Sequence, residues 1–257
     1  MVLNKYLHTI FYTFILTLTF HAYLHADSFR NILSLTSYNY TDDTASHVIE
    51  DTFMEIVKKK LTYYGSIYYD SHQTWSNKIL SLGGAYLLFP GNYFEAYYGY
   101  GINSLDSRAD YLTLAYNIEG PSYYLNISYR LSSFSGYSYH LISPGGRYFF
   151  IPRFSVWLKP YFSIDTTNNF NYSLWIQTEY RFSQKYVLKL GTVIGDITID
   201  NISVKPVVSH FVSGIAGIDY EISDKLTVKY VFEYLTNESN TGYYKNNLVL
   251  DIRFDIK

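Results

Sequence analysis

The last ten residues of the chain, 248–257, alternate between apolar and polar side chains. The apolar positions are Leu248, Leu250, Ile252, Phe254 and Ile256, and the charged positions between them are Asp251, Arg253, Asp255 and Lys257. Because successive side chains of a β-strand point to opposite faces, this period of two gives one apolar face and one charged face. A helix would scatter the same residues around its axis. The segment therefore predicts a β-strand whose apolar face meets either a protein core or lipid.

Three earlier segments, 122–131, 172–182 and 225–234, repeat this alternation. In each, mostly apolar and aromatic residues occupy every second position. The positions between them hold serines, amides and charges, together with Tyr124, Trp175, Thr227 and Val231. The pattern favours one sheet with an apolar side and a polar side.

Strand-like segments follow one another along the whole mature chain, and no segment has the pattern of an amphipathic helix. The predicted strands are 31–40, 49–59, 61–70, 77–89, 92–102, 109–118, 122–131, 137–150, 153–164, 172–182, 185–195, 207–222, 225–234 and 243–256. Many are close to the ~9–11 residues that a tilted membrane strand needs. The expected count is about fourteen, or about twelve because 49–59 is weakly patterned.

The links between these segments alternate in length. Tight links built largely from turn residues are expected at 60, 90–91, 119–121, 151–152, 183–184 and 223–224. Longer polar links are expected at 41–48, 71–76, 103–108, 132–136, 165–171, 196–206 and 235–242. Such alternation is typical of hairpins that end on two different sides of a membrane, and it places both termini on the short-turn, periplasmic side.

The N-terminal residues have the features of a secretory signal peptide. Lys5 precedes an apolar stretch at 10–20, and Ala22 and Ala26 are small residues suited to cleavage. The apolar stretch is shorter than the ~20 residues of a membrane-spanning helix, which disfavours an anchor. We expect a signal peptide at 1–26 and a barrel domain at 27–257.

The composition favours lipid rather than a protein core against the apolar faces. The chain has 31 Tyr and 3 Trp, and its aromatic fraction of 20% suits strands that cross a membrane interface. The net charge of -2 is too small to indicate nucleic acid, and the absence of Cys excludes disulfides and a lipoprotein anchor. We expect an all-β fold, a transmembrane up-and-down antiparallel β-barrel, in contact with outer-membrane lipid and the outer-membrane assembly machinery. The alternative is a secreted soluble β-protein.

Several segments resemble the YaiO family of outer-membrane β-barrels. The resemblance rests on Tyr129-Arg130, Phe134, Tyr139-His140-Leu141, the run 143–150 (SPGGRYFF) and the segment 172–195 with Glu179-Tyr180-Arg181. It implies an outer-membrane barrel and carries no catalytic or binding residues. One departure is the C-terminal Lys257, because barrels of this kind usually end on an aromatic residue that the assembly machinery reads.

The sequence shows no clear catalytic, metal or cofactor site. His47 and His72 fall in predicted loops, His140 precedes a Pro-Gly-Gly run, and His210 opens a predicted strand. A catalytic triad is a spatial arrangement, so an outer-membrane enzyme acting on lipid or surface glycan remains the alternative function. Loop carboxylates at 42–43, 106 and 110 could hold only a weak Ca²⁺ ion. The glycine pairs at 83–84 and 145–146 predict bulges or bends.

If the apolar faces meet lipid, nine charged side chains point into the barrel lumen. They are Arg130, Glu179, Arg181, Lys189, Asp219, Lys229, Glu233, Asp251 and Arg253. About fourteen strands lie between the ~8 whose interior side chains fill and the ~16 that leave a wide channel. The barrel is therefore expected to be structural or to form a narrow, partly plugged channel for small solutes or glycans. In the structural case the charges pair with one another and stabilise the wall.

Overall fold

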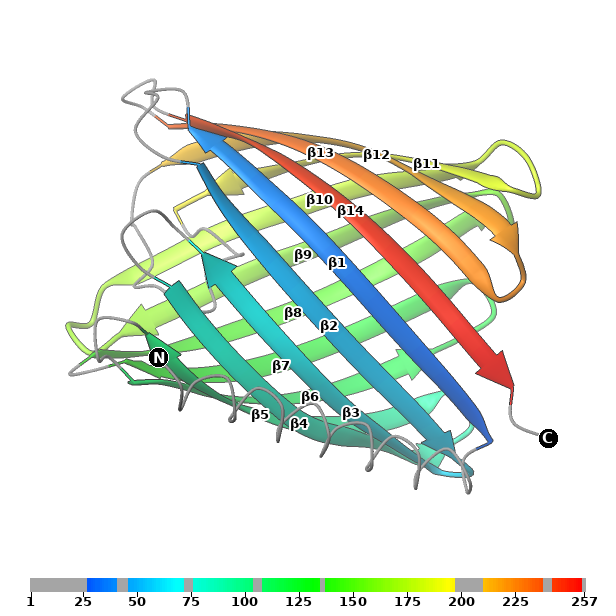
Figure 1. Ribbon diagram of the computed structural model, residues 1–257, viewed down its shortest axis with the longest axis horizontal. Helices are drawn as coiled ribbons and strands as arrows, with labels where there is room; N and C mark the ends of the chain where they lie inside the picture. The colour runs from blue at the N-terminus through cyan, green and yellow to red at the C-terminus, as the bar shows by residue number, and fades with distance from the viewer. Residues whose placement is uncertain are drawn as a thin grey trace, which may run out of the picture.

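The chain forms a closed antiparallel β-barrel of fourteen strands (Figure 1). The computed structural model describes residues 27–40, 46–71, 76–103, 108–134, 137–196, 210–237 and 242–255. The strands are β1 (Ser28–Tyr40), β2 (Ser46–Lys58), β3 (Leu61–Ser71), β4 (Ser76–Phe89), β5 (Asn92–Asn103), β6 (Arg108–Glu119), β7 (Tyr123–Phe134), β8 (Tyr137–Ile151), β9 (Phe154–Asp165), β10 (Phe170–Arg181), β11 (Tyr186–Gly195), β12 (Phe211–Ser223), β13 (Leu226–Asn237) and β14 (Gly242–Asp255). Each strand pairs with its neighbours in the sequence.

The predicted fold class is confirmed, and each of the fourteen predicted segments overlaps one strand. Several strands, for example β2, β7 and β13, extend further than predicted at the rim opposite the tight turns. Residues 132–134, predicted to lie in a loop, continue β7 and pair with the start of β8. The predicted signal peptide and Lys257 lie outside the described residues. Within the described ranges, no helix is long and apolar enough to cross a membrane.

The barrel closes where β1 pairs with β14. Their register runs from Ser28 opposite Asp255 to Tyr40 opposite Tyr243. The start of β1 and the end of β14 therefore lie at one rim, as Figure 1 shows. An even number of strands requires this arrangement, because each hairpin returns the chain to the rim where it began.

The same rim carries the tight turns. Lys59–Lys60, Pro90–Gly91, Pro152–Arg153 and Asp224–Lys225 each join two adjacent strands. Gly91 has a φ of 76°, and a Cβ at this position would lie 2.4 Å from the carbonyl oxygen of Glu119. Only glycine fits such a turn without displacing the neighbouring strand end.

The register shifts lie close to the tight turns and not at the predicted glycine pairs. They occur between Leu87 and Phe89, between Phe149 and Ile151, and between Glu221 and Ser223. Gly83 and Gly84 pair without a shift, so the prediction of a bulge there was wrong. A Cβ on Gly83 would lie 2.2 Å from the Cβ of Tyr97, and glycine therefore permits a close approach of β4 and β5.

One interruption of the barrel wall lies in the middle of β8 and β9. Their pairing stops after Ile142 and resumes at Gly146 in the same register. That register sets Pro144 opposite Pro160, and neither residue has a backbone N–H to donate. The Ser143 hydroxyl instead donates to the carbonyl oxygen of Pro160 at 3.0 Å. A side chain thus bridges part of the missing ladder.

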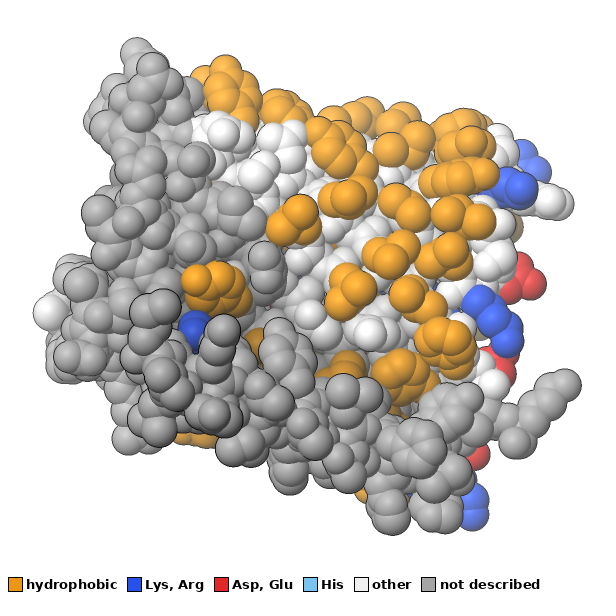
Figure 2. Space-filling model, in the orientation of Figure 1, with side chains coloured by type: hydrophobic (Ala, Val, Ile, Leu, Met, Phe, Trp, Pro, Cys, Tyr) orange, Lys and Arg blue, Asp and Glu red, His pale blue; other side chains and the backbone are white. Residues whose placement is uncertain are grey.

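The barrel has its polar side chains inside and its apolar side chains outside. The largest fully buried side chains are all polar, namely those of Asn117, Asp251, Ser132, Ser143, Ser155, Ser173 and Ser213. Large apolar residues are instead exposed, for example Leu82 at 62% and Ile127 at 53%. Figure 2 shows a broad band of hydrophobic side chains on the outer surface, with Lys, Arg, Asp and Glu at one edge. This distribution is the reverse of that in a soluble protein.

Candidate functional site in the barrel lumen

Two cavities lie inside the barrel. One, which we call the aromatic cavity, has a volume of about 540 Å³, and the second has a volume of about 760 Å³. The aromatic cavity is lined by alternate residues of ten strands, which confirms that these positions share one face. The second reaches toward the tight-turn rim at Lys59 and Glu119. Both volumes lie in or near the ~300–1,000 Å³ range of small-molecule pockets.

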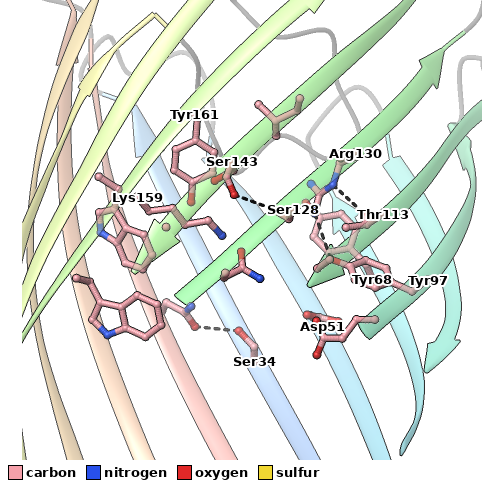
Figure 3. A pocket seen from close by; sticks show the side chains of 18 of the residues that line it. Ser34, Asp51, Tyr68, Tyr97, Thr113, Ser128, Arg130, Ser143, Lys159 and Tyr161 are labelled. Atoms are coloured by element: carbon pink, nitrogen blue, oxygen red, sulfur yellow. Dashed lines mark hydrogen bonds between the residues drawn. The ribbon is translucent and has the colours of Figure 1, made fainter. Parts of the chain in front are cut away.

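Arg130 on β7 lies between the two cavities and lines both of them, as do Glu95 and Tyr97. Its guanidinium donates to the hydroxyl of Thr113 at 3.1 Å and to that of Tyr97 at 3.4 Å. The guanidinium carbon also lies 5.4 Å from the centre of the Tyr111 ring. Neutral hydroxyls and a ring therefore hold Arg130, and among the described residues it has no carboxylate partner (Figure 3).

Three aromatic rings lie side by side in the aromatic cavity. The indoles of Trp157 on β9 and Trp175 on β10 are stacked, with ring centres 6.2 Å apart and an interplanar angle of 19°. The ring of Tyr124 on β7 lies 5.4 Å from that of Trp157. On β8, which lies between β7 and β9, Arg147 is the cross-strand partner of both Tyr124 and Trp157, and its guanidinium carbon lies 5.5 Å from the centre of the Trp157 ring. We call Tyr124, Trp157 and Trp175 the aromatic platform.

The aromatic cavity contains charges of both signs. Lys159 is the cross-strand partner of Trp175, so its side chain begins beside the platform. Its ammonium lies 5.3 Å from the centre of the Tyr161 ring. Two carboxylates, those of Asp51 and Glu95, come from the distant strands β2 and β5. In the described part of the chain, none of these three residues forms an ion pair with a side chain of opposite charge.

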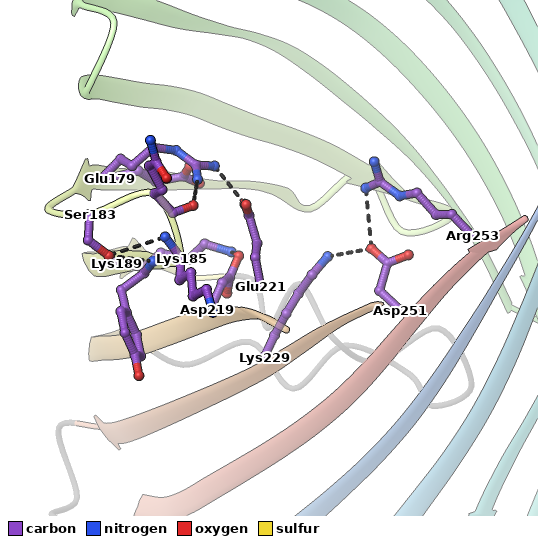
Figure 4. A network of polar contacts seen from close by, with 12 residues as sticks. Glu179, Ser183, Lys185, Lys189, Asp219, Glu221, Lys229, Asp251 and Arg253 are labelled. Carbon is purple, nitrogen blue, oxygen red and sulfur yellow. Dashed lines mark hydrogen bonds and ion pairs between the residues drawn. The ribbon is translucent and has the colours of Figure 1, made fainter. Parts of the chain in front are cut away.

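Elsewhere in the lumen, charged side chains pair along the wall rather than across it (Figure 4). Lys189 on β11 binds Asp219 on β12 at 2.7 Å, and Arg181 binds Glu221 at 2.7 Å. Each pair joins strands that are adjacent or next but one in the barrel. In each pair the opposite charges neutralise each other beside the same part of the wall, and no pair bridges the lumen.

Asp251 on β14 is the centre of a group of charges. Its side chain has no exposed surface, and it accepts from Arg30 at 2.7 and 2.8 Å and from Lys229 at 3.0 Å. Arg253 lies 3.5 Å away, and Arg30 also reaches Glu55 at 3.5 Å. Two short contacts from one guanidinium fix both oxygens of a carboxylate that is removed from water.

Eight of the nine predicted lumen residues lie in ion pairs. The structure brings Lys189 to Asp219, and Lys229 and Arg253 to Asp251. The other pairs use partners that sequence reasoning missed: Arg147 for Glu179, Glu221 for Arg181, and Lys245 for Glu233. Arg130, the ninth residue, lines the two cavities instead. Whether these residues line a permeation path stays a prediction.

Sequence reasoning also missed the cavity residues Asp51, Glu95, Trp157, Lys159 and Trp175. Each lies within a predicted strand. The alternation in 172–182 does put Trp175 on the polar face with Glu179 and Arg181, but only the charged residues of that face were predicted to line the lumen.

The histidines do not assemble a catalytic site in the described part of the chain. His210, at the rim opposite the tight turns, contacts the carboxylate of Asp196 through Nδ1, but no described serine hydroxyl bonds to it. His140 is exposed, and its Nδ1 lies 2.7 Å from the Tyr129 hydroxyl. His72 and the side chain of His47 lie outside the described residues. No group of three or more His, Asp or Glu residues within the described ranges could hold a metal ion.

No protein-family model matches this chain, and no curated protein matches it. Solved structures do. One is the CymD monoaromatic hydrocarbon channel, with 8% identity and a TM-score of 0.62 over 90% of this chain and 88% of that chain. Another is the Ralstonia pickettii toluene transporter TbuX, with 10% identity and a TM-score of 0.61 over 91% and 90% of the two chains.

A third similar structure is the Acinetobacter baumannii outer membrane protein Omp33, with 11% identity and a TM-score of 0.54. The match covers 89% of this chain and 100% of that chain. At such low identity the likeness shows the fold, that of outer-membrane β-barrels. The narrower resemblance to the YaiO family stays a prediction.

Proposed function

We propose that this chain is an integral outer-membrane β-barrel of the YaiO type whose lumen forms a narrow channel for small solutes. The observation that carries the proposal is the reversal of polarity across the wall. Leu248 and Ile127 are exposed at 51% and 53%, whereas the side chains of Asp251 and Ser132 are buried. An apolar outer face is unfavourable in water and favourable in lipid, where a closed barrel also satisfies its own backbone hydrogen bonds.

The distribution of aromatic residues on the outer face supports a membrane position. On β10, Tyr172 and Tyr180 lie toward the two ends of the strand, with Leu174 and Ile176 between them. On β7, Tyr123 begins the strand, and Leu125 and Ile127 follow it on the same face. Aromatic girdles at two interfaces with an aliphatic band between them are typical of outer-membrane barrels. A strand of 12 residues at ~3.3 Å per residue and ~40° tilt rises about 30 Å, enough for the ~25 Å apolar band.

The proposed location is the bacterial outer membrane, with both termini in the periplasm. The tight-turn rim carries the start of β1 and the end of β14, and short turns face the periplasm in barrels of this kind. Export by a signal peptide at 1–26 and insertion by the outer-membrane assembly machinery complete the proposal. The similar solved structures include channels and transporters, which favours a transport role.

The lumen supports a narrow channel because its charges pair along the wall and leave two cavities open. Arg130 stands between the cavities and limits the opening there. Purified protein in planar bilayers should give small, discrete conductance steps. An absence of steps from correctly folded protein would contradict the channel and leave a structural barrel.

We do not favour the alternative of an outer-membrane enzyme acting on lipid or glycan. The contact between His210 and Asp196 is the only part of a catalytic triad among the described residues, and it lacks a nucleophile. Incubating purified protein with phospholipid or surface glycan should give no turnover. Turnover that is lost in His210→Asn, or in His140→Asn, would overturn this assignment.

A further inference from the structure

The aromatic platform is an unusual use of tryptophan in this chain. The sequence has 3 Trp, and two of them, Trp157 and Trp175, line one cavity inside a barrel whose fully buried side chains are polar. Apolar side chains elsewhere have the outer face available to them. Two large rings that line an aqueous lumen instead offer flat apolar surface to a solute.

The residues around the platform are polar. Ser34, Asn247 and Asn126 line the same cavity, together with several tyrosines (Figure 3). The Ser34 hydroxyl donates to the Asn247 side-chain oxygen at 2.9 Å, which leaves the amide N–H groups of Asn247 free to donate. A ligand that fits must present an apolar face to the rings and hydroxyl groups at its edges. A sugar ring has this combination: its C–H groups form the faces, and its hydroxyls point outward.

A purely apolar ligand fits the cavity less well. Arg130, Lys159, Asp51 and Glu95 would lose water on binding such a ligand and would gain no new partner. Their charges therefore favour a ligand that itself carries charge or many hydroxyl groups.

The charge beside the platform is positive. Lys159 lies on the strand of Trp157 and pairs across the ladder with Trp175, whereas Asp51 lies on the distant strand β2. Lys189, Lys229 and Lys245 each bind a carboxylate of the protein, but Lys159 binds none in the described ranges. Its ammonium is therefore available to a carboxylate from a solute.

We propose that the aromatic cavity binds acidic saccharides, with a uronic acid ring stacked on Trp157 and Trp175 and its carboxylate bound by Lys159. The proposal names the solute class of the channel proposed above and rests on that function. The cavity volume of about 540 Å³ suits a short saccharide rather than a polymer coil.

Tryptophan fluorescence of the folded protein in detergent tests the proposal without any measurement of transport. In a Trp75→Phe background, the two remaining tryptophans both lie in the cavity. Titration with digalacturonate should give a saturable change in emission. The dimethyl ester of the same disaccharide, which has the same rings and no charge, should bind at least tenfold more weakly.

Substitutions separate the two parts of the proposed site. Lys159→Met should reduce the preference for digalacturonate over its ester to less than threefold. Trp175→Leu should weaken both ligands, as followed by the remaining Trp157. Lys225→Met, at an exposed turn on the rim, is the matched control and should change neither affinity. Heat-dependent migration on a denaturing gel checks that each variant is folded.

Three results would overturn the proposal: no saturable change with digalacturonate, equal binding of acid and ester, or toluene binding without saccharide binding. Bilayer recordings distinguish this failure from failure of the channel. Conductance that digalacturonate does not block, together with an absence of binding in detergent, would retain the channel and reject the saccharide. Binding in detergent without conductance would retain the site and reject the channel.

Discussion

Arg30 on the first strand holds Asp251 on the last strand through two hydrogen bonds, although the two residues are 221 positions apart in the sequence. The contact lies on the seam where β1 and β14 close the barrel. Because the Asp251 side chain is fully buried, its charge depends on Arg30 and Lys229 for compensation.

We predict that Asp251→Asn destabilises the barrel by about 3 kcal/mol, because the partly buried cations of Arg30 and Lys229 lose the carboxylate that they share, and only Arg30 keeps another carboxylate, Glu55 at 3.5 Å. Lys225→Ala breaks an exposed ion pair to Asp255, with side chains 58% and 73% exposed, and should cost under about 1 kcal/mol. Urea unfolding of both variants in lipid, followed by tryptophan emission, gives the two values. Equal losses would mean that the seam contact adds nothing beyond an ordinary surface pair.

The membrane position predicts that the cost of a charge on the outer face depends on depth. Leu248→Arg, near the middle of β14, should cost about 2–4 kcal/mol, and Phe254→Arg, near its end, about 0–1 kcal/mol. Both residues are exposed, at 51% and 44%, so neither change disturbs a protein core. The measurement is the free energy of unfolding in phospholipid vesicles. Similar costs at both positions would contradict a bilayer around this surface.

Removal of Arg130 should widen the passage between the two cavities. Arg130→Ala deletes the side chain that lines both, so single-channel conductance should rise at least twofold and anion preference should fall. Arg253→Ala is the control, because that side chain is 56% exposed at the rim and lines neither cavity. Unchanged conductance in Arg130→Ala would place the narrowest point elsewhere.

Two glycines should respond in opposite ways to alanine. Gly83→Ala brings a methyl group against the backbone of β5, 2.4 Å from the carbonyl oxygen of Ala96, and should cost about 1–3 kcal/mol. A Cβ on Gly214 meets nothing within 4 Å, so Gly214→Ala should be neutral or add about 0.4–1 kcal/mol by restricting the unfolded chain. Thermal unfolding in detergent compares the two. A neutral Gly83→Ala would show that β4 and β5 can separate freely.

The alternation of side chains was sufficient to predict the barrel. The apolar side chains of Tyr123, Leu125 and Ile127 at every second position predict an outer face. The structure places all three on the exposed surface. Strand ends were harder to predict, because a serine such as Ser132 suits both a loop and the polar inner face. The structure places Ser132 in β7 with its side chain buried.

The charge pairs could not be predicted, because register and barrel curvature decide which inner side chains meet. Arg147 on β8 reaches Glu179 on β10 past the intervening strand, where its Nε donates to the small Ser155 at 2.8 Å. The sequence separation of such a pair has no fixed value. Sequence reasoning therefore predicted that Glu179 faces inward, but it did not predict that Arg147 is its partner.

Pro144 and Pro160 leave the wall with a place where adjacent strands share no backbone hydrogen bonds between Ile142 and Gly146. Strands on either side of that place can change their relative tilt slightly without breaking a ladder bond. Ser143 and Lys159, which flank the two prolines, line the aromatic cavity, so that cavity borders a stretch of wall held by side-chain contacts in place of ladder bonds.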